Sequence, residues 1–348
     1  MSRLIKEQIM DSLKVLSIPG DNHNIVDMKR LSEIFIVEDT VYLSINVPHD
    51  IAERLHSLRL QAQEIIQTMP NIRNAVVTLT GNKNPDQGIK KIIHTKSNVK
   101  SFIAVASGKG GVGKSTTAVN IACALKSKGY NVAILDADIY GPSVPKLLKL
   151  SGKAEISKKK TLKPMENYGI KVMSMASLVD ESVAMIWRGP MVQSAIMHMF
   201  NDVDWGSLDL LLIDMPPGTG DAHLTIAQKI PLSGVIIVST PQDLSLIDVK
   251  RAISMYQKMN VPIVGMIENM SYFVASDTGK KYDLFGSGGA RVEAEKIGIP
   301  FLESIPFDID IRMLSDLGTP IVIHDPNSIS AGIYQKISDS IQQFCVSK

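Results

Sequence analysis

Residues 102–115 read FIAVAS-GKGGVGKS, and residues 116–129 continue as TTAVNIACALKSKG. The segment Gly108–Ser115 fits the pattern G-x-x-x-x-G-K-[ST], in which glycines let backbone N–H groups turn inward around phosphate oxygens. An apolar run precedes this loop and a helix-forming run follows it, which is the context that the pattern requires. The stretch therefore predicts a buried strand, a phosphate-binding loop and a helix in direct succession.

The same loop predicts the ligand, which is a nucleotide bound with Mg²⁺. Lys114 supplies a positive charge to the β- and γ-phosphates, and the Ser115 hydroxyl is a ligand for Mg²⁺. The start of the following helix adds its own partial positive charge. We therefore expect an ATPase that binds and hydrolyses Mg-ATP. The residues expected to contact the nucleotide here are Gly108, Lys109, Gly110, Gly111, Val112, Gly113, Lys114, Ser115 and Thr116.

Three aspartates end apolar runs elsewhere in the chain. Asp214 closes the run LLLID and is expected to hold a Mg²⁺-bound water, while Asp136 closes the run VAILD as a second candidate metal ligand. Asp138 follows two residues later and could orient the attacking water as a catalytic residue, with Lys109 and Lys114. Each aspartate alone could equally be a helix cap or turn residue. Their positions at strand ends favour the functional interpretation.

Short apolar runs recur through the rest of the chain and alternate with helical stretches. Their apolar residues lack strict alternation, as expected for parallel strands covered on both faces. The predicted fold class is therefore α/β, a P-loop NTPase with a mainly parallel sheet and helices on both faces. The expected strands are 102–107, 132–136, 170–174, 208–214, 234–240 and 263–268.

The chain before the loop has a different pattern of apolar residues. This pattern predicts a separate small α/β domain over residues 1–80. The pattern there predicts a first helix, strands near 31–37 and 41–47, a helix over about 50–68 and a strand at 75–79. Residues 81–99 are polar and lack periodicity, so they are expected to be a linker. The P-loop ATPase domain is then expected over residues 100–348.

Composition narrows the class of protein. Hydrophobic residues make up 45% of the 348 residues, charged residues 21%, and the net charge is +2. That balance gives no reason to expect nucleic acid as a partner. Two cysteines exclude a disulfide framework, and no apolar run reaches the length of about 20 residues that a membrane helix needs. The expectation is a cytoplasmic protein with no stable membrane association.

Lys109 is an additional lysine early in the loop, which a generic P-loop does not need. It resembles the variant Walker A motif of the family that includes MinD, ParA and the nitrogenase iron protein. In that family the lysine reaches across a dimer interface to the ATP of the other subunit, like an arginine finger. The resemblance implies a homodimer with nucleotide at its interface.

Four motifs narrow the resemblance to the Mrp/ApbC family of iron–sulfur cluster carrier ATPases. They are DADIYGPS at 136–143, WRGPM at 187–191, DMPPGTGD at 214–221 and ENMSYF at 268–273. The resemblance implies delivery of clusters to apo iron–sulfur proteins or scaffold proteins. It also implies that Asn269 and Pro306 approach the adenine, and that the N-terminal unit is an iron–sulfur-assembly domain. Arg188 is either a site residue or a packing residue at a helix start.

The chain departs from this family at one point. Cluster carriers usually have Cys-Pro-x-Cys-Gly one residue after NMSYF, so that two thiolates from each subunit can hold one cluster. Ala275 and Thr278 occupy those cysteine positions, and neither can replace a thiolate. Cys123 has the spacing of a core residue, Cys345 lies near the C-terminus, and His223 is expected at the surface rather than as a ligand. A cluster therefore remains possible, but its usual ligands are missing.

Two alternatives stay open on the sequence. A MinD/ParA-type positioning ATPase would attach to membranes through a basic amphipathic C-terminal helix. Residues 329–341 do repeat isoleucine at helical spacing, but no cationic cluster accompanies them, so this helix is expected to pack on the sheet. The second alternative is a cluster-free, ATP-driven assembly partner. A scaffold that only binds nucleotide is disfavoured because all the catalytic residue types are present.

Overall fold

The chain divides into two compact units, Met1–Lys90 and Lys91–Lys348. Each unit buries its own set of apolar side chains. The computed structural model describes residues 2–18, 23–28, 30–31, 34–37, 40–47, 55–70, 72–80, 98–157, 161–178 and 189–347.

The first unit packs two helices on a three-stranded sheet. Its elements are α1 (Ser2–Leu13), β1 (Phe35–Val37), β2 (Thr40–Asn46), α2 (His56–Gln67) and β3 (Asn74–Thr80). Strand β2 lies in the middle, antiparallel to β1 and parallel to β3. Burial alternates along β2, so Val41, Leu43 and Ile45 share one core with Ile9 and Ile66 of the helices. The expected small α/β fold is confirmed.

Several expected boundaries in this part of the chain differ from the structure. The strand expected at 31–37 is reduced to β1, and Leu31 forms only an isolated bridge with Ile45. The helix expected from residue 50 begins at His56 in the described chain, and residues 48–54 lie outside it. Of the expected linker, residues 81–97 also lie outside the described chain. Its last two residues belong to β4, because Asn98 and Val99 pair with the neighbouring strand.

The second unit is built on an eight-stranded sheet of order β13-β10-β9-β4-β8-β5-β7-β6. All neighbouring strands are parallel except β6, which is antiparallel to β7. The strand bounds are β4 (Asn98–Ser107), β5 (Val132–Asp136), β6 (Met165–Asn167), β7 (Ile170–Ser174), β8 (Ser207–Asp214), β9 (Gly234–Ser239), β10 (Ile263–Glu268) and β13 (Phe301–Ser304). This confirms the mainly parallel sheet expected from the sequence.

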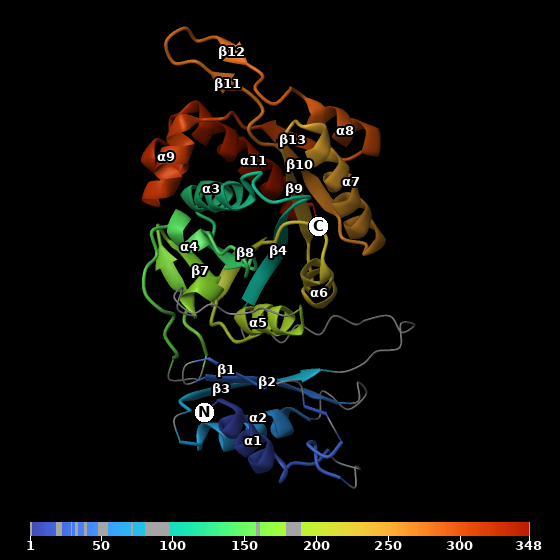
Figure 1. The fold of residues 1–348 in the computed structure, drawn as a ribbon. Coiled ribbons are helices and arrows are strands. Elements are labelled where there is room, and N and C mark those ends of the chain that lie inside the picture. The colour runs from blue at the N-terminus through green and yellow to red at the C-terminus, as the bar shows by residue number, and fades with distance from the viewer. Residues whose placement is uncertain are drawn as a thin grey trace. The chain divides into compact units, whose positions relative to one another are not determined.

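Helices cover both faces of this sheet (Figure 1). One face carries α5 (Gly189–Asn201), α6 (Asp221–Lys229), α7 (Asp243–Lys258) and α8 (Gly289–Ile297). The other carries α3 (Lys114–Ser127), α4 (Val144–Leu147), α9 (Ile309–Leu317), α10 (Ile321–His324) and α11 (Ile329–Val346). A short 3₁₀ helix spans Met175–Ser177. The central strand shows why both faces are apolar, since Phe102 and Ala104 face the first helix layer and Ile103 faces the second.

Two edge strands were not expected from the sequence. Strand β13 has two apolar and two polar residues, all half-buried, so it lacks the continuous apolar run of the inner strands. Strand β6 is joined to β7 by a two-residue turn at Tyr168 and Gly169, whose φ angles are 51° and 71°. Positive φ at both positions is the geometry of a type I′ hairpin, and tyrosine at the first of them is an uncommon signal for it.

The C-terminal helix packs on the sheet as expected. Ile333, Ile337 and Ile341 of α11 are buried in the core below α3, whereas Ile329 is 80% exposed at the helix start. Within the described part of the chain, no helix has the length and apolar character needed to cross a membrane.

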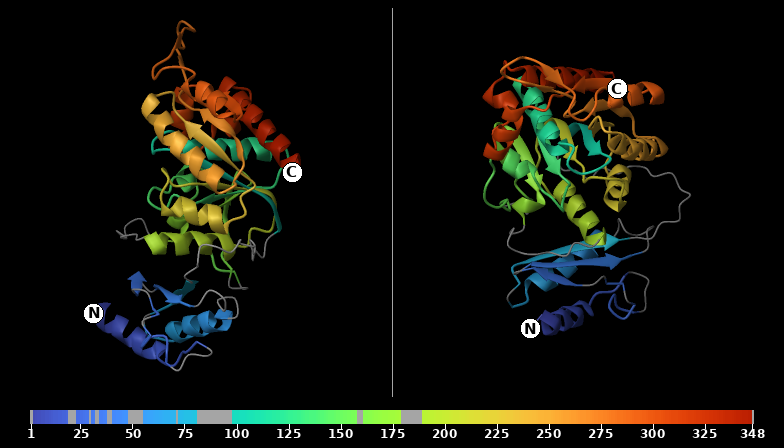
Figure 2. Two further views of the ribbon diagram at one scale, coloured as in Figure 1. Left: turned by 90° about the vertical axis from the view of Figure 1, so that its right-hand side faces the viewer. Right: turned by 45° about the horizontal axis from the view of Figure 1, so that its top comes forward.

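A two-stranded hairpin leaves the sheet between β10 and α8. It consists of β11 (Phe273–Val274) and β12 (Lys281–Tyr282), which pair antiparallel. It extends beyond the helices of its own unit (Figure 1, top; Figure 2, left). Residues 276–287, which include the hairpin tip, are exposed.

Candidate nucleotide site

The loop between β4 and α3 has the backbone conformation of a phosphate cradle. Gly111 and Gly113 both have φ of 79°, a region that other residues rarely adopt. A Cβ atom on Gly113 would also lie 2.2 Å from Nδ2 of Asn269, so a side chain here would displace the Asn269 amide. Helix α3 begins at Lys114, directly after the loop, so its first N–H groups face the cradle.

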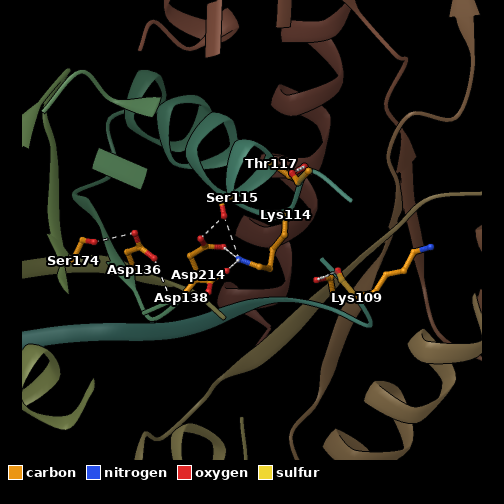
Figure 3. Close-up of polar contacts among 10 residues, drawn as sticks. Lys109, Lys114, Ser115, Thr117, Asp136, Asp138, Ser174 and Asp214 are labelled. Atoms are coloured by element: carbon orange, nitrogen blue, oxygen red, sulfur yellow. Dashed lines mark hydrogen bonds and ion pairs between the residues drawn. The ribbon is translucent and has the colours of Figure 1, made fainter. Parts of the chain in front are cut away.

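Lys114 is the centre of a buried polar cluster (Figure 3). Its Nζ lies 2.6 Å from Oδ1 of Asp214 and 3.9 Å from Oδ2 of Asp138. The Ser115 hydroxyl donates to the other oxygen of Asp214 at 2.6 Å, and Lys114 Nζ donates to that hydroxyl at 3.2 Å. The cluster therefore brings together one lysine, one hydroxyl and the carboxylates expected from separate strand ends.

Parallel pairing explains why these aspartates meet. Strand β8 lies between β4 and β5, and Asp136 is the register partner of Asp214. The carboxyl ends of the three strands therefore lie at one edge of the sheet, beside the loop. The two side chains at this edge are almost fully buried, with 1% exposure for Asp136 and 0% for Asp214.

Asp136 carries a perturbed carboxyl group. Burial raises its pKa well above the ordinary value, and the negative charge of Asp214 raises it further. Lys114 and a hydrogen bond from the Ser174 hydroxyl, at 3.0 Å, act in the opposite direction. Burial also raises the pKa of Asp138. Ser174 was not singled out from the sequence, because a serine at the end of β7 carries no motif.

The oxygen ligands at this edge fit a hard divalent cation. Hydroxyl and carboxylate oxygens are the ligands that Mg²⁺ takes in proteins, together with substrate phosphates. The acidic side chains outnumber the one buried lysine, so the free site has spare negative charge. Within the described chain no group of three or more His, Cys, Asp or Glu forms a metal cage on its own. That agrees with the way Mg²⁺ binds, since phosphates complete its coordination.

Lys109 stands apart from this cluster. Its side chain points away from Lys114 and the carboxylates (Figure 3). The residue is half-buried, and its carbonyl accepts a hydrogen bond from the Ser107 hydroxyl at 2.9 Å. No salt bridge to Lys109 occurs within the described residues.

The two residues expected near the adenine lie on adjoining elements. Asn269 follows β10, is 7% exposed, and donates from Nδ2 to the Val112 carbonyl of the loop at 2.8 Å. Pro306 is buried after β13, next to Ile305, whose N–H donates to the carbonyl of Glu268. Both residues therefore adjoin the strand that ends beside the loop. Trp187 and Arg188 lie outside the described residues.

His223 corrects an expectation, because it is 1% exposed rather than a surface residue. It lies on the inner face of α6 with Ile226, Ala227 and Ile230, the i, i+3, i+4, i+7 spacing that a helical reading of this segment would have found. Its Nε2 is buried without a hydrogen-bond partner, and its ring meets Tyr256 edge-on at 6.5 Å between centroids. Burial, and secondarily the charge of Lys114, lower the pKa of His223 to about 4.

The buried imidazole predicts a pH-dependent stability. The pKa of His223 is lower in the folded protein than its ordinary 6.5, so the stabilisation is complete above pH 6.5 and is lost as pH falls toward 4. Within that window the free energy of unfolding should fall by up to about 1.4 kcal/mol per pH unit from this group. His223→Phe should remove this part of the slope.

Urea unfolding between pH 7 and pH 5, followed by tryptophan fluorescence, measures the effect. Both tryptophans, Trp187 and Trp205, belong to the second unit, so the signal follows that unit alone. His324→Gln, a change at an exposed side chain, is the control. An unchanged pH slope in His223→Phe would show that His223 is not the responsible group.

The hairpin holds the positions where cluster carriers place cysteine. Ala275 N–H donates to the Lys280 carbonyl at 3.0 Å, and Gly279 N–H donates to the Ala275 carbonyl at 2.8 Å. The Thr278 hydroxyl accepts from the Lys280 N–H at 3.4 Å. These residues close a tight turn, and they present a methyl group and a hydroxyl where iron would need thiolates.

Neither cysteine lies at the hairpin. Cys123 is fully buried in α3, as its spacing predicted, and burial raises the pKa of its thiol to about 12. Such a thiol is protonated at neutral pH and is a poor metal ligand. Cys345 is half-buried near the end of α11.

A strand, a phosphate cradle and a helix at the centre of a parallel sheet, with acidic strand ends beside them, define a P-loop nucleotide-binding protein. The family model described as "NUBPL iron-transfer P-loop NTPase" matches residues 98–342, and the model "Iron-sulfur cluster assembly protein" matches residues 6–79. The chain belongs to this family of iron-transfer P-loop NTPases. The expected family is thereby confirmed.

Curated relatives carry the same description. The chain is 38% identical over 343 residues to the iron-sulfur cluster carrier protein of Synechocystis, with 97% of each protein covered. It is 39% identical over 347 residues to the carrier protein of Escherichia coli K12, covering 97% of this chain and 91% of that protein. It is 50% identical over 244 residues to the Arabidopsis thaliana iron-sulfur protein required for NADH dehydrogenase, covering 70% and 78%.

Solved structures show the same fold. The nucleotide-binding protein of Archaeoglobus fulgidus, in complex with ADP, is 41% identical, with a TM-score of 0.58 over 66% of this chain and 90% of that one. The cell division ATPase MinD of Pyrococcus furiosus is 20% identical, with a TM-score of 0.53 over 70% and 99%. The likeness to MinD is one of fold alone, and the positioning ATPase is the weaker interpretation.

Proposed function

We propose that this chain binds and hydrolyses Mg-ATP as a homodimer and uses the cycle in the assembly or transfer of iron–sulfur clusters. The observation that carries the proposal is the meeting of Lys114, Ser115 and Asp214 at the loop. The family membership and the carrier proteins among its relatives support the iron–sulfur role. The proposed partners are apo iron–sulfur proteins or scaffold proteins, in the cytoplasm, with neither nucleic acid nor a membrane.

The residues have separate proposed roles in ATP turnover. The loop from Gly108 to Thr116 holds the phosphates, and Lys114 exchanges Asp214 for phosphate oxygens when nucleotide enters. Ser115 and Asp214, with Asp136 behind them, hold Mg²⁺, which supplies charge neutralisation of the phosphates when bound. Asp138 orients the attacking water. Its partial exposure, against the full burial of Asp136, supports that division of roles.

Two more roles involve residues outside the carboxylate cluster. Lys109 completes the site of the partner subunit, a role supported by the direction of its side chain (Figure 3). Asn269 and Pro306 flank the adenine. The proposed domain boundaries are 1–80 for the small assembly-type domain, 81–99 for the linker and 100–348 for the ATPase. The two family matches, at 6–79 and 98–342, support this division within a few residues.

We propose that iron–sulfur clusters are assembled or transferred without a cysteine pair at the hairpin. Ala275 and Thr278 close the turn and offer no thiolate, and the Cys123 thiol is buried away from it. Anaerobic reconstitution with iron and sulfide, followed by gel filtration, should therefore leave no near-stoichiometric cluster on the dimer. ATP hydrolysis by the same preparation should be intact.

A variant tests the chemical reason directly. Ala275→Cys with Thr278→Cys places two thiols across the hairpin turn, and the dimer then offers the four thiolates that a cluster needs. This variant should retain iron and sulfide after gel filtration where the parent protein does not. Stable, stoichiometric incorporation in the parent would contradict the proposal and direct attention to other ligands, with Cys345 first. An absence of ATP hydrolysis in the parent would overturn the ATPase proposal itself.

A further inference from the structure

Glu268 is a fully buried carboxylate at the end of β10 that joins both ends of the hairpin segment. Residues 269–288, here called the arm, leave the sheet after Glu268 and return at the start of α8. One carboxylate oxygen accepts from the Ser271 hydroxyl and from the Gly288 N–H, at 2.5 and 3.1 Å. The other accepts from the Ala290 N–H at 2.8 Å. A single side chain therefore fastens the outgoing and the returning chain together.

These hydrogen bonds also satisfy the N-terminus of α8. The first N–H groups of a helix have no partner within the helix, and α8 has no side-chain cap of its own. Glu268 takes that place from a distant strand, and its negative charge lies at the positive end of the helix. An amide at this position would offer one acceptor and would turn an N–H group toward another N–H group.

The bases of the arm are in contact with the phosphate-binding loop. Asn269 donates from Nδ2 to the Val112 carbonyl, and its own N–H donates to the Ser239 carbonyl at 2.7 Å. Met270 and Phe285, one on each side of the hairpin, line a cavity of about 250 Å³ against the loop. The other lining residues are Lys109, Gly110, Gly111, Val112, Thr240 and Gln242.

The far end of the arm has no such support. Its tip is exposed and extends beyond the helices of the second unit (Figure 1; Figure 2, left). The hairpin is held by its own turn and by contacts such as Lys281 Nζ, which lies 4.0 Å above the Tyr272 ring. The arm therefore has a fixed base beside the nucleotide site and an exposed end.

We infer that Glu268 is a positioning residue that makes the arm respond to nucleotide. The inference rests on the proposed binding of nucleotide at the loop. When the loop binds phosphates, the Val112 carbonyl and Met270 become less mobile. Because Glu268 is hydrogen-bonded to the N–H groups of Gly288 and Ala290, the mobility of the returning chain falls as well. Without the carboxylate, the outgoing chain still meets the loop. The returning chain keeps packing contacts such as that of Phe285 with Phe307 but loses the hydrogen bonds from Gly288 and Ala290 to Glu268.

Hydrogen exchange of the full-length protein, with and without saturating Mg-ADP, tests the inference. Two regions are followed, the loop at 108–116 and the arm with its return at 269–290. In the parent protein Mg-ADP should slow exchange in both. In Glu268→Gln the loop should still be slowed, but the arm should exchange about tenfold faster than in the parent, because a charge-assisted hydrogen bond is lost. Its exchange should then be insensitive to Mg-ADP.

Glu293→Gln is the matched control. Glu293 is also a buried carboxylate, but its partner is Lys250, at 3.1 Å, and no hydrogen bond or ion pair joins it to the described residues of the arm. This variant should keep the response of the arm to Mg-ADP. Ser271→Ala removes one donor to Glu268 and leaves both backbone hydrogen bonds intact, so it serves if Glu268→Gln does not fold. It should reduce the response without abolishing it.

The outcomes separate the possible failures. If Glu268→Gln, or Ser271→Ala in its place, keeps the full response of the arm, the inference is overturned. It is also overturned if Mg-ADP does not change exchange in the arm of the parent protein. In both cases the proposed nucleotide binding still stands. A purely structural role of Glu268 would speed exchange of the arm equally with and without nucleotide, and that result also overturns it. If the loop of the parent itself shows no slowing, the proposed nucleotide binding fails, and the inference fails with it.

Discussion

Lys109→Ala is expected to bind Mg-ATP as the parent protein does and to lose hydrolysis about a thousandfold, the effect of removing an arginine finger. The reason is the direction of the side chain, which points away from Lys114 and the carboxylates of its own site (Figure 3). Removing a charge that is directed away from the carboxylate cluster should leave nucleotide binding in the same subunit largely unchanged. Its loss is felt in the site of the partner subunit, where the transferring phosphate then lacks the charge that the second copy would supply.

The measurement is a pair of titrations on each variant, nucleotide binding by calorimetry and phosphate release at saturating ATP. Lys109→Arg keeps a positive charge and should recover part of the activity. Lys258→Ala removes an exposed lysine from the end of α7 and is the control for a general loss of charge. Mixing Lys109→Ala with an excess of a binding-deficient variant that retains Lys109 should restore hydrolysis in mixed dimers. Unchanged hydrolysis by Lys109→Ala would remove Lys109 from the mechanism.

Lys114→Ala is expected to lose nucleotide binding by about a hundredfold or more, since it removes the buried positive charge that the loop is proposed to offer to the phosphates. It should also destabilise the free protein. Asp214 is fully buried 2.6 Å from the ammonium group, and Asp136 and Asp138 lie on the same side. Breaking such a pair leaves uncompensated buried charge, which costs about 3–5 kcal/mol.

Three comparisons isolate that cost in urea unfolding followed by tryptophan fluorescence. Lys114→Ala combined with Asp214→Asn should recover much of the lost stability and none of the nucleotide binding. Lys128→Ala breaks an exposed pair with Asp339 and should cost less than about 1 kcal/mol. Lower pH should reduce the difference in free energy of unfolding between Lys114→Ala and the parent protein. The reason is that Asp136, whose pKa is already raised, takes up a proton first. A gap that does not narrow would contradict this electrostatic explanation.

The inner strands of the fold could be predicted from the sequence because their burial is uniform. Strands such as β5 and β9 are buried at every position, so a run of apolar residues marks them without ambiguity. The edge strands could not be found this way. Strand β13 is half-buried along its length, and β6 depends on a turn whose positive φ at Tyr168 follows from tertiary contacts rather than from residue type.

The position of Lys114 beside Ser115 was predictable because it depends on local spacing. Ser115 follows Lys114 on one turn of helix, and any fold that forms this turn brings the two together. Partners from distant strands were only partly predictable. Asp214 was found since it ends an apolar run, but Ser174 and Glu268 act through contacts that no spacing encodes. His223 was placed at the surface because it follows a glycine-rich loop, yet its helix turns it into the core.

The ion pair between Lys114 and Asp214 has a consequence for the release of nucleotide from the loop. The lysine is neutralised by a carboxylate of the same chain, so a nucleotide competes with an internal ligand for it. We expect this competition to weaken the binding of ADP, because Asp214 pairs with Lys114 again as soon as ADP leaves.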